Sequence, residues 1–159
     1  MNIREIKPED NAQIETIMRA CFLEFGLPVV GSSLEDEDVM KMYEGFQLDH
    51  AMYYVVEDHG KIVGGGGVKQ LKGADRDTCE LQKMYFHPTA RGKGYGRILF
   101  DKCMKAATDL GYKYCYLESA SQLKSAIRLY ERNGFKNLEK PYGNTGHVIC
   151  GVWMIKKLI

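Results

Sequence analysis

This sequence of 159 residues lacks a strong excess of charge of either sign, a long apolar run and a recognisable leader. Its 22 Lys plus Arg nearly balance 21 Asp plus Glu, so the net charge of +1 gives no global reason to expect a nucleic-acid partner or an anionic membrane. No apolar run approaches the ~20 residues that span a membrane. The opening MNIREIKPED is charged and unlike a signal peptide, and we therefore expect a cytoplasmic protein.

Cysteine patterns that would indicate a disulfide framework or a metal site are also missing. The chain has five cysteines, an odd number, and they are scattered without a C-x-x-C pair or a short Cys/His spacing. Structural zinc sites depend on such spacing. We therefore expect reduced thiols and no bound metal. The cysteines are Cys21, Cys79, Cys103, Cys115 and Cys150.

Repeats, low-complexity tracts and linkers are absent as well, which predicts one domain over residues 1–159. Apolar patterns of period 2 and period 3.6 alternate along the chain. They predict helices at 14–25, 34–48, 92–110 and 123–132, and strands at 2–7, 78–86, 112–119, 135–140 and 147–158, with two more joined at 58–60 within 51–71. The expected architecture is one mixed sheet with helices on both faces.

Four consecutive glycines, residues 64–67, stand inside one of these predicted strands. Glycine weakens a strand and leaves one of its faces without side chains. Either a bound group approaches that face closely, or a neighbouring helix packs against it.

Charge is distributed unevenly along the chain. Between residues 83 and 105 six Lys and Arg side chains accompany a single acid, Asp101, whereas between residues 34 and 50 six acids accompany only Lys41. The basic region favours an anion and the acidic region a cation. The acidic run could also simply start or solvate a helix.

The stretch YFHPTARGKGYGRILF, residues 85–100, places three glycines and three bases where a strand gives way to a helix. Amides at a helix start have no intrahelical partner, and glycines let an oxygen-rich anion approach them. The Walker pattern is absent because no Lys-Ser/Thr follows the glycines, and the dinucleotide fingerprint fails because Arg97 replaces its last glycine. A phosphate site is indicated, with a flexible basic turn as the alternative.

Two motifs resemble signatures of the GNAT superfamily of acyl-CoA-dependent N-acetyltransferases. RGKGYG, residues 91–96, matches the Arg/Gln-x-x-Gly-x-Gly pyrophosphate loop, and LYERNGF, residues 129–135, resembles the later Leu-Tyr-x-x-x-Gly-Phe signature. Their order, separation and strand–helix context agree, and the likeness runs along the whole chain. The resemblance implies an α+β (mixed α/β) fold: a mostly antiparallel, twisted sheet of six to seven strands, splayed in the middle, with helices on both faces.

The resemblance also implies acetyl-CoA as cosubstrate. Its pyrophosphate would lie on the loop amides, and its pantetheine arm would pair with the preceding strand, where the Met84 amide would donate to the thioester carbonyl. Many members carry Asn at the position of Leu123, so Ser121, Gln122 or Ser125 would have to replace its contacts. The implied cofactor-binding residues are Met84, Tyr85, Phe86, Arg91, Gly92, Lys93, Gly94, Tyr95, Gly96, Arg97 and Ser125.

Two side chains match proton-transfer positions of the family. Glu80 occupies the frequent general-base position, eleven residues before Arg91, and Tyr130 matches the tyrosine that many members use as general acid toward the coenzyme thiolate. Strand alternation would put Glu80 on one face with Gln82 and Met84. The alternatives are a Glu80 paired with a lysine of a neighbouring strand and a Tyr130 packed in the core.

The resemblance places the acceptor site between residues 34–50 and the last hairpin, 143–153, where acids would attract a cationic amine and Tyr142 or His147 could line the pocket. His147 is interpreted as a turn or strand residue because nothing pairs with it in the sequence. We predict an N-acetyltransferase that moves acetyl from acetyl-CoA to a primary amine of a small molecule or peptide, by direct attack in a ternary complex. A non-catalytic acyl-CoA sensor is the alternative, and the short basic patch disfavours a nucleic-acid binder. Exposed C-terminal strands favour a homodimer.

Overall fold

The computed structural model describes residues 1–159 and contains one seven-stranded sheet. Its strand order is β1-β2-β3-β4-β5-β7-β6, and every neighbouring pair is antiparallel except β4 with β5. The strands are β1 (Asn2–Glu5), β2 (Met52–Asp58), β3 (Lys61–Gln70), β4 (Thr78–Phe86), β5 (Tyr114–Ser119), β6 (Lys136–Asn137) and β7 (Val152–Lys157). The helices are α1 (Asn11–Glu24), α2 (Met42–Gly45), α3 (Tyr95–Asp109) and α4 (Lys124–Arg132). The predicted α+β class with a mostly antiparallel sheet is confirmed.

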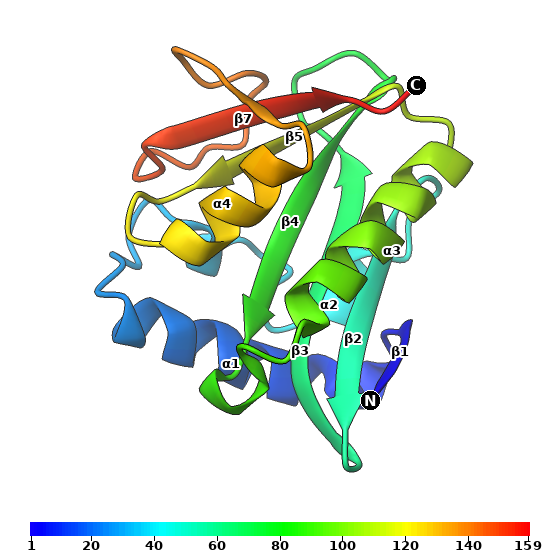
Figure 1. Ribbon diagram of the computed structural model, residues 1–159, viewed down its shortest axis with the longest axis vertical. Helices are drawn as coiled ribbons and strands as arrows, with labels where there is room; N and C mark the ends of the chain where they lie inside the picture. The colour runs from blue at the N-terminus through cyan, green and yellow to red at the C-terminus, as the bar shows by residue number, and fades with distance from the viewer.

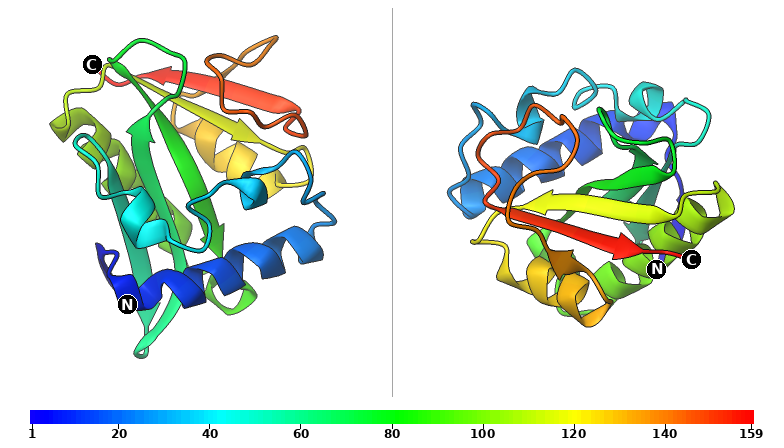
Figure 2. Two further views of the ribbon diagram at one scale, coloured as in Figure 1. Left: turned by 180° about the vertical axis from the view of Figure 1, so that it is seen from behind. Right: turned by 90° about the horizontal axis from the view of Figure 1, so that it is seen from above.

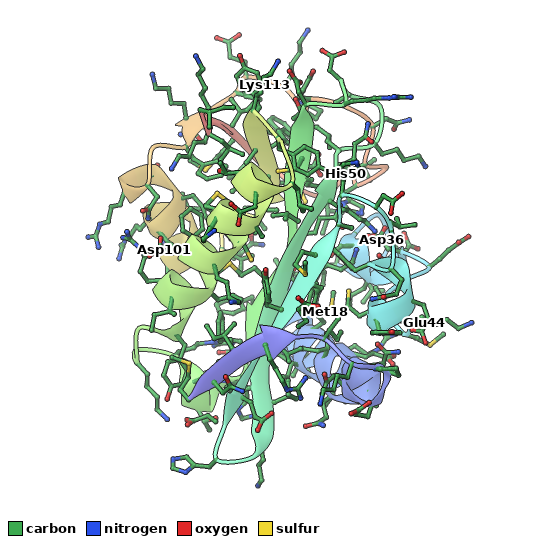
Figure 3. All side chains as sticks on the ribbon, turned by 90° about the vertical axis from the view of Figure 1, so that its right-hand side faces the viewer. Met18, Asp36, Glu44, His50, Asp101 and Lys113 are labelled. Carbon is green, nitrogen blue, oxygen red and sulfur yellow. The ribbon has the colours of Figure 1, made fainter.

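Helices cover both faces of the sheet, with α3 and α4 on one face and α1 and α2 on the other (Figures 1 and 2). The face under α3 and α4 buries a core that includes Leu99 and Phe100, and the face toward α1 buries a second core that includes Ile14. Figure 3 shows Met18 of α1 on one side of the sheet and Asp101 of α3 on the other. Burial from both sides explains the nearly continuous apolar run of β2. No helix combines the length and the apolarity that a membrane crossing would need.

The helix predicted at residues 34–48 is wrong. The structure has a 3-10 turn at Ser33–Glu35 and the single turn α2, separated by bends and turns. Tertiary contacts override the helical pattern, because Asp36 and Asp38 each lie 3.0 Å from the ammonium of Lys83, and Asp38 also pairs with Lys69 at 2.9 Å. Asp36 and Asp38 are therefore drawn toward the sheet and do not solvate a helix.

Strands β4 and β5 separate in the middle of the sheet, as Figure 1 shows. Their parallel pairing runs from Thr78↔Tyr114 to Glu80↔Tyr116 and then stops, although β4 continues to Phe86. The predicted splay is therefore present. It leaves the outer edge of the second half of β4 without a partner strand on that side.

A β-bulge lies in the same half of β4. Gly65 pairs with Tyr85 and Gly67 with Gln82, so β4 carries one residue more than β3 across this interval. Lys83 within it has a φ of +52°, a left-handed conformation that is uncommon for lysine. The hydroxyl of the buried Tyr53 donates a hydrogen bond to the Lys83 carbonyl at 2.9 Å and so helps to hold the bulge.

Side chains of neighbouring elements occupy the space that the glycines of β3 leave open. A Cβ atom at Gly64 would overlap the ring of Phe86, and one at Gly65 would overlap Tyr53 and Ile14 of α1. The sequence left open whether a bound group or a neighbouring helix approaches this face. Close packing of strand and helix side chains accounts for it.

Candidate active site

Two cavities lie along β4. The larger, of about 340 Å³, is bounded by the end of β4, the loop before α3 and the start of α4. The smaller, of about 60 Å³, is bounded by the first half of β4, the end of β5 and the loops before α2 and β7. Tyr85 and Leu123 line both cavities, so the two spaces adjoin.

The loop at residues 91–96 presents bare backbone to the larger cavity. Gly92 and Gly94 adopt φ values of +71° and +80°, and neither has an atom within 4 Å of the position that a Cβ would take. The amide of Arg91 donates to the Pro88 carbonyl at 3.2 Å, whereas the amides of residues 92–97 have no acceptor in the protein. Unpaired amides at a helix start form an anion site. The predicted phosphate loop therefore has the required backbone geometry.

The basic side chains of this loop are tied to acids. The Arg91 guanidinium donates to Glu24 of α1 at 2.5 Å and to the Phe86 carbonyl at 2.9 Å. Lys93 lies 3.5 Å from Asp58, which also accepts a hydrogen bond from the Tyr95 hydroxyl at 3.0 Å. These pairs fix the loop to α1 and to the β2–β3 turn, and they leave the backbone amides as its main anion-binding groups.

The predicted coenzyme contacts line the larger cavity, apart from Lys93 and Arg97. Its lining includes Met84, Tyr85 and Phe86 of β4 and Ser125 of α4. Arg97 does not line it, because this exposed side chain pairs with Asp101 one helical turn away at 2.8 Å.

The start of α4 forms the opposite wall. Leu123, the N-cap residue, offers no side-chain cap, as expected for a leucine. Among the proposed replacements for the family Asn, Gln122 and Ser125 line the cavity. Ser121 does not, and its hydroxyl donates to Gln122 at 3.3 Å.

Tyr130 of α4 is both a core residue and a cavity residue. Its ring packs at 6.1 Å from Phe100 and 5.9 Å from Phe135, and burial raises the pKa of its phenol. It also lines the larger cavity, and its hydroxyl has no hydrogen-bond partner in the protein. The two interpretations of Tyr130 are therefore compatible, because packing fixes the ring while the hydroxyl stays available as a donor.

Glu80 lies buried in the wall of the smaller cavity, with 5% of its surface exposed. One carboxylate oxygen accepts a hydrogen bond from the Gln82 amide at 2.6 Å. Burial and the nearby Glu118 carboxylate raise the pKa of Glu80 to about 7. The alternative of a strand lysine as partner is wrong, because Lys69 directly opposite Glu80 binds Asp38 instead.

The bulge in β4 changes which residues share a face. Simple alternation predicted Glu80, Gln82 and Met84 on one face, but Met84 packs against the core under α3 and α4. Tyr85 instead packs toward α1 and lines the smaller cavity with Glu80. The predicted shared face of Glu80 and Met84 is therefore wrong, because the extra residue inverts the alternation.

Glu118 and His147 complete the polar end of the smaller cavity. Glu118 accepts hydrogen bonds from the Tyr116 hydroxyl at 2.7 Å and the Thr145 hydroxyl at 2.9 Å. His147 lies with Nε2 2.9 Å from Asp36 and with Nδ1 3.6 Å from Glu118, and these carboxylates raise the pKa of His147 to about 9. His147 is thus a paired residue of the site.

Sequence reasoning missed Glu118 and the partners of His147. The sequence did contain a signal for Glu118. Glutamate is uncommon in buried strands, and Glu118 stands in the otherwise apolar strand YCYLES. The pairing of His147 with Asp36 joins residues far apart in the sequence and had no local signal.

Glu80, Glu118 and His147 offer ligand atoms within 4.8 Å of one another, a spacing that a single metal ion could bridge. The His147 imidazole, with its pKa of about 9, holds its proton at neutral pH and points both nitrogens at carboxylates. This arrangement favours a proton-sharing network over metal ligation. The expected absence of a metal stays a prediction.

Comparison with known proteins identifies the family. The profile of the acetyltransferase (GNAT) family matches residues 12–135. The uncharacterized N-acetyltransferase YjgM of Escherichia coli K12 is 41% identical over 157 residues, which cover 98% of this chain and 94% of that protein. The uncharacterized N-acetyltransferase C1271.07c of Schizosaccharomyces pombe is 28% identical over 138 residues, 86% of this chain and 83% of that protein.

Solved structures agree at the level of the fold. A GNAT-family acetyltransferase of Staphylococcus aureus Mu50 superposes with a TM-score of 0.87 at 19% identity, covering 99% of each chain. YncA of Salmonella typhimurium, determined with its cofactor acetyl-CoA, superposes with a TM-score of 0.81 at 24% identity, covering 100% of this chain and 94% of that one. The resemblance inferred from the two motifs and the prediction of an acetyltransferase are confirmed. The chain belongs to the GNAT family of acetyltransferases.

Proposed function

We propose that this protein transfers an acetyl group from acetyl-CoA to a primary amine by direct attack in a ternary complex. The supporting observation is that the larger and smaller cavities adjoin at Tyr85 and Leu123. An acyl group carried along the larger cavity would thus meet an amine held beside Glu80. The Salmonella YncA structure, which contains acetyl-CoA, has the same fold.

The larger cavity would receive the coenzyme. The free amides of residues 92–97 would receive the pyrophosphate, and the unpartnered edge of β4 would receive the pantetheine arm. The contribution of Arg91 would be to position the loop, because its guanidinium already binds Glu24. Met84, at the bulge, would offer its backbone N–H to the thioester oxygen as negative charge develops there.

Glu80 would accept the proton that the attacking nitrogen loses. A pKa of about 7 keeps it partly ionised at neutral pH and makes it a stronger base than an ordinary glutamate. The nitrogen–carbon bond forms as the carbon–sulfur bond breaks, with one proton passing from nitrogen to Glu80. Gln82 would orient the carboxylate through its hydrogen bond at 2.6 Å.

Tyr130 would donate a proton to the departing coenzyme sulfur. Its hydroxyl has no partner in the protein and belongs to the cavity proposed to hold the pantetheine arm. The resulting phenolate regains a proton from solvent and Glu80 releases one, so a neutral amine and the thioester give the amide and the thiol without net loss of protons.

Calorimetric titration with acetyl-CoA, followed by release of free thiol with a panel of amines, tests the proposal. We expect binding and transfer in the unmodified protein. Tyr130→Phe should lower kcat by about 10²-fold or more while the Kd of acetyl-CoA changes little. Tyr114→Phe, an exposed tyrosine of β5, is the matched control and should leave both unchanged. Unaltered turnover in Tyr130→Phe would remove the acid role, and absence of acetyl-CoA binding would overturn the whole proposal.

A further inference from the structure

The smaller cavity contains two carboxylates, although a single general base would require only one. Glu80 and Glu118 come from adjacent strands and offer oxygens within 4.8 Å of each other and of His147. We propose that Glu118 determines acceptor specificity: with Glu80 it binds a small primary amine in its ammonium form and disfavours amines that carry a carboxylate beside the nitrogen. This inference rests on the proposed function and names its substrate class.

Glu118 is prepared for this role by its own hydrogen bonds. Tyr116 and Thr145 donate to its two oxygens at 2.7 and 2.9 Å, which fixes the carboxylate before any ligand arrives. Its side chain is 3% exposed. Glu80 keeps one oxygen without a protein partner, because Gln82 occupies only Oε2. An ammonium group between the two carboxylates would therefore find acceptors on both sides.

The cations near the cavity cannot serve a substrate carboxylate. Lys83, whose side chain is 2% exposed, places its ammonium 3.0 Å from both Asp36 and Asp38. His147 is held between Asp36 and Glu118. The carboxylates Asp36, Asp38, Glu80 and Glu118 outnumber the cations Lys69, Lys83 and His147, so a carboxylate on the acceptor would add to an excess of negative charge.

The shape of the cavity favours a small molecule over a protein side chain. Its volume is about 60 Å³, and Phe22, Leu27 and Ile149 supply apolar walls. Two loops meet over it, because the Val148 amide donates to the Gly31 carbonyl at 2.9 Å and His147 binds Asp36. A lysine on a folded protein would have to separate these loops, whereas a short alkylamine would not.

Charge and protons balance in the expected reaction. The ammonium loses one proton to Glu80, which passes it to solvent, and the neutral nitrogen then attacks the thioester carbon. Glu80 takes the second proton as the nitrogen–carbon bond forms, and the sulfur leaves with a proton from Tyr130. The ammonium and acetyl-CoA thus give the amide, the free thiol and one proton released to water.

Three amines separate the effect of charge from that of size: butylamine, norvaline and norvalinamide. Norvaline is butylamine with a carboxylate on the carbon next to nitrogen, and norvalinamide replaces that carboxylate with a neutral amide of nearly equal size. Thiol release gives kcat/KM for each, expressed per concentration of the ammonium form, which is the species proposed to bind. We expect kcat/KM for butylamine and for norvalinamide to exceed that for norvaline by a factor on the order of 10². The reason is that the carboxylate of norvaline would be repelled by two nearby carboxylates in a partly buried site.

Glu118→Gln should lower kcat/KM for butylamine about tenfold or more and reduce the norvalinamide-to-norvaline ratio by a similar factor, with the KM of acetyl-CoA unchanged. Glu139→Gln, an exposed glutamate, is the matched control. The ratio is internal to each variant, so partial unfolding of Glu118→Gln would not alter it.

Three results would contradict the inference while leaving acetyl transfer established. Norvaline could match norvalinamide, the ratio could survive Glu118→Gln, or a lysine-containing peptide could be a better acceptor than butylamine. Acetyl-CoA binding without transfer to any amine, peptides included, would instead overturn the proposed function.

Discussion

The two cavities that meet at Tyr85 and Leu123 are built by different means. The larger one relies on backbone, since its anion-binding groups are the amides of residues 92–97 and its strand edge is the splayed half of β4. The smaller one relies on side chains from separate segments, with Glu80, Glu118 and His147 at its polar end. A backbone site depends on one continuous stretch of sequence, whereas a side-chain site depends on how distant segments fold together.

This difference explains how far each could be predicted from sequence. The phosphate loop is a local pattern of glycines after a strand and before a helix, and the structure has it at the expected residues. Strand β4 was predicted at 78–86 and lies at Thr78–Phe86. The pairing of His147 with Asp36 spans 111 residues and has no local signature.

The errors share one physical cause, which is tertiary override of a local pattern. The acidic segment at 34–48 has helical spacing, but ion pairs with Lys83 and Lys69 hold it in turns. The alternation along β4 fails because the Tyr53 hydroxyl and the glycines of β3 accommodate a bulge at Lys83. Neither effect can be derived from the periodicity of one segment alone.

The largest expected effect concerns the side-chain cavity. Glu80→Gln should lower kcat by about 10²–10⁴-fold near neutral pH because the base is lost. Part of the lost activity should return at high pH, where more of the amine is already neutral. A pH profile of kcat with a saturating amine checks this, with Glu139→Gln as control. An equally large defect at all pH values would count against the base role.

A smaller effect is expected at the backbone cavity. Gly94→Ala adds a Cβ at a residue with a φ of +80°, where strain would displace the amides. The Kd of acetyl-CoA should rise about tenfold, equivalent to roughly one hydrogen bond to a charged group. Gly111→Ala is matched, with a φ of +91° and open surroundings, and calorimetry should find its Kd unchanged. Equal weakening in both variants would mean that general strain, and not the loop, is responsible.

The free energy of unfolding should depend on the pair between His147 and Asp36, which joins the two loops of the smaller cavity. In the folded protein His147 has a pKa of about 9, above its ordinary value. Its pairing with Asp36 therefore stabilises the folded state fully below pH ~6.5, and this stabilisation is lost as the pH rises past 9. His147→Asn should therefore cost roughly 2 kcal/mol at pH 6 and little at pH 10. Denaturant melts at both pH values measure this, with the exposed His59→Asn as control. A cost independent of pH would show that packing alone is lost.

The smallest expected effect is a shift of a pH profile. Glu118 raises the pKa of Glu80, while His147 and Lys83 lower it. The acid limb of kcat/KM should lie near pH 7 in the unmodified protein, because Glu80 must be ionised to act, and should move to lower pH by up to about one unit in Glu118→Gln. A limb that stays in place would show that another group controls it.

A crystal structure with coenzyme A and butylamine tests most directly whether the coenzyme and the amine occupy the two adjoining cavities. The account predicts the diphosphate on the amides of residues 92–97, the sulfur between Tyr130 and the Met84 amide, and the amine nitrogen beside Glu80. A diphosphate held elsewhere, or an amine that does not reach the smaller cavity, would contradict it.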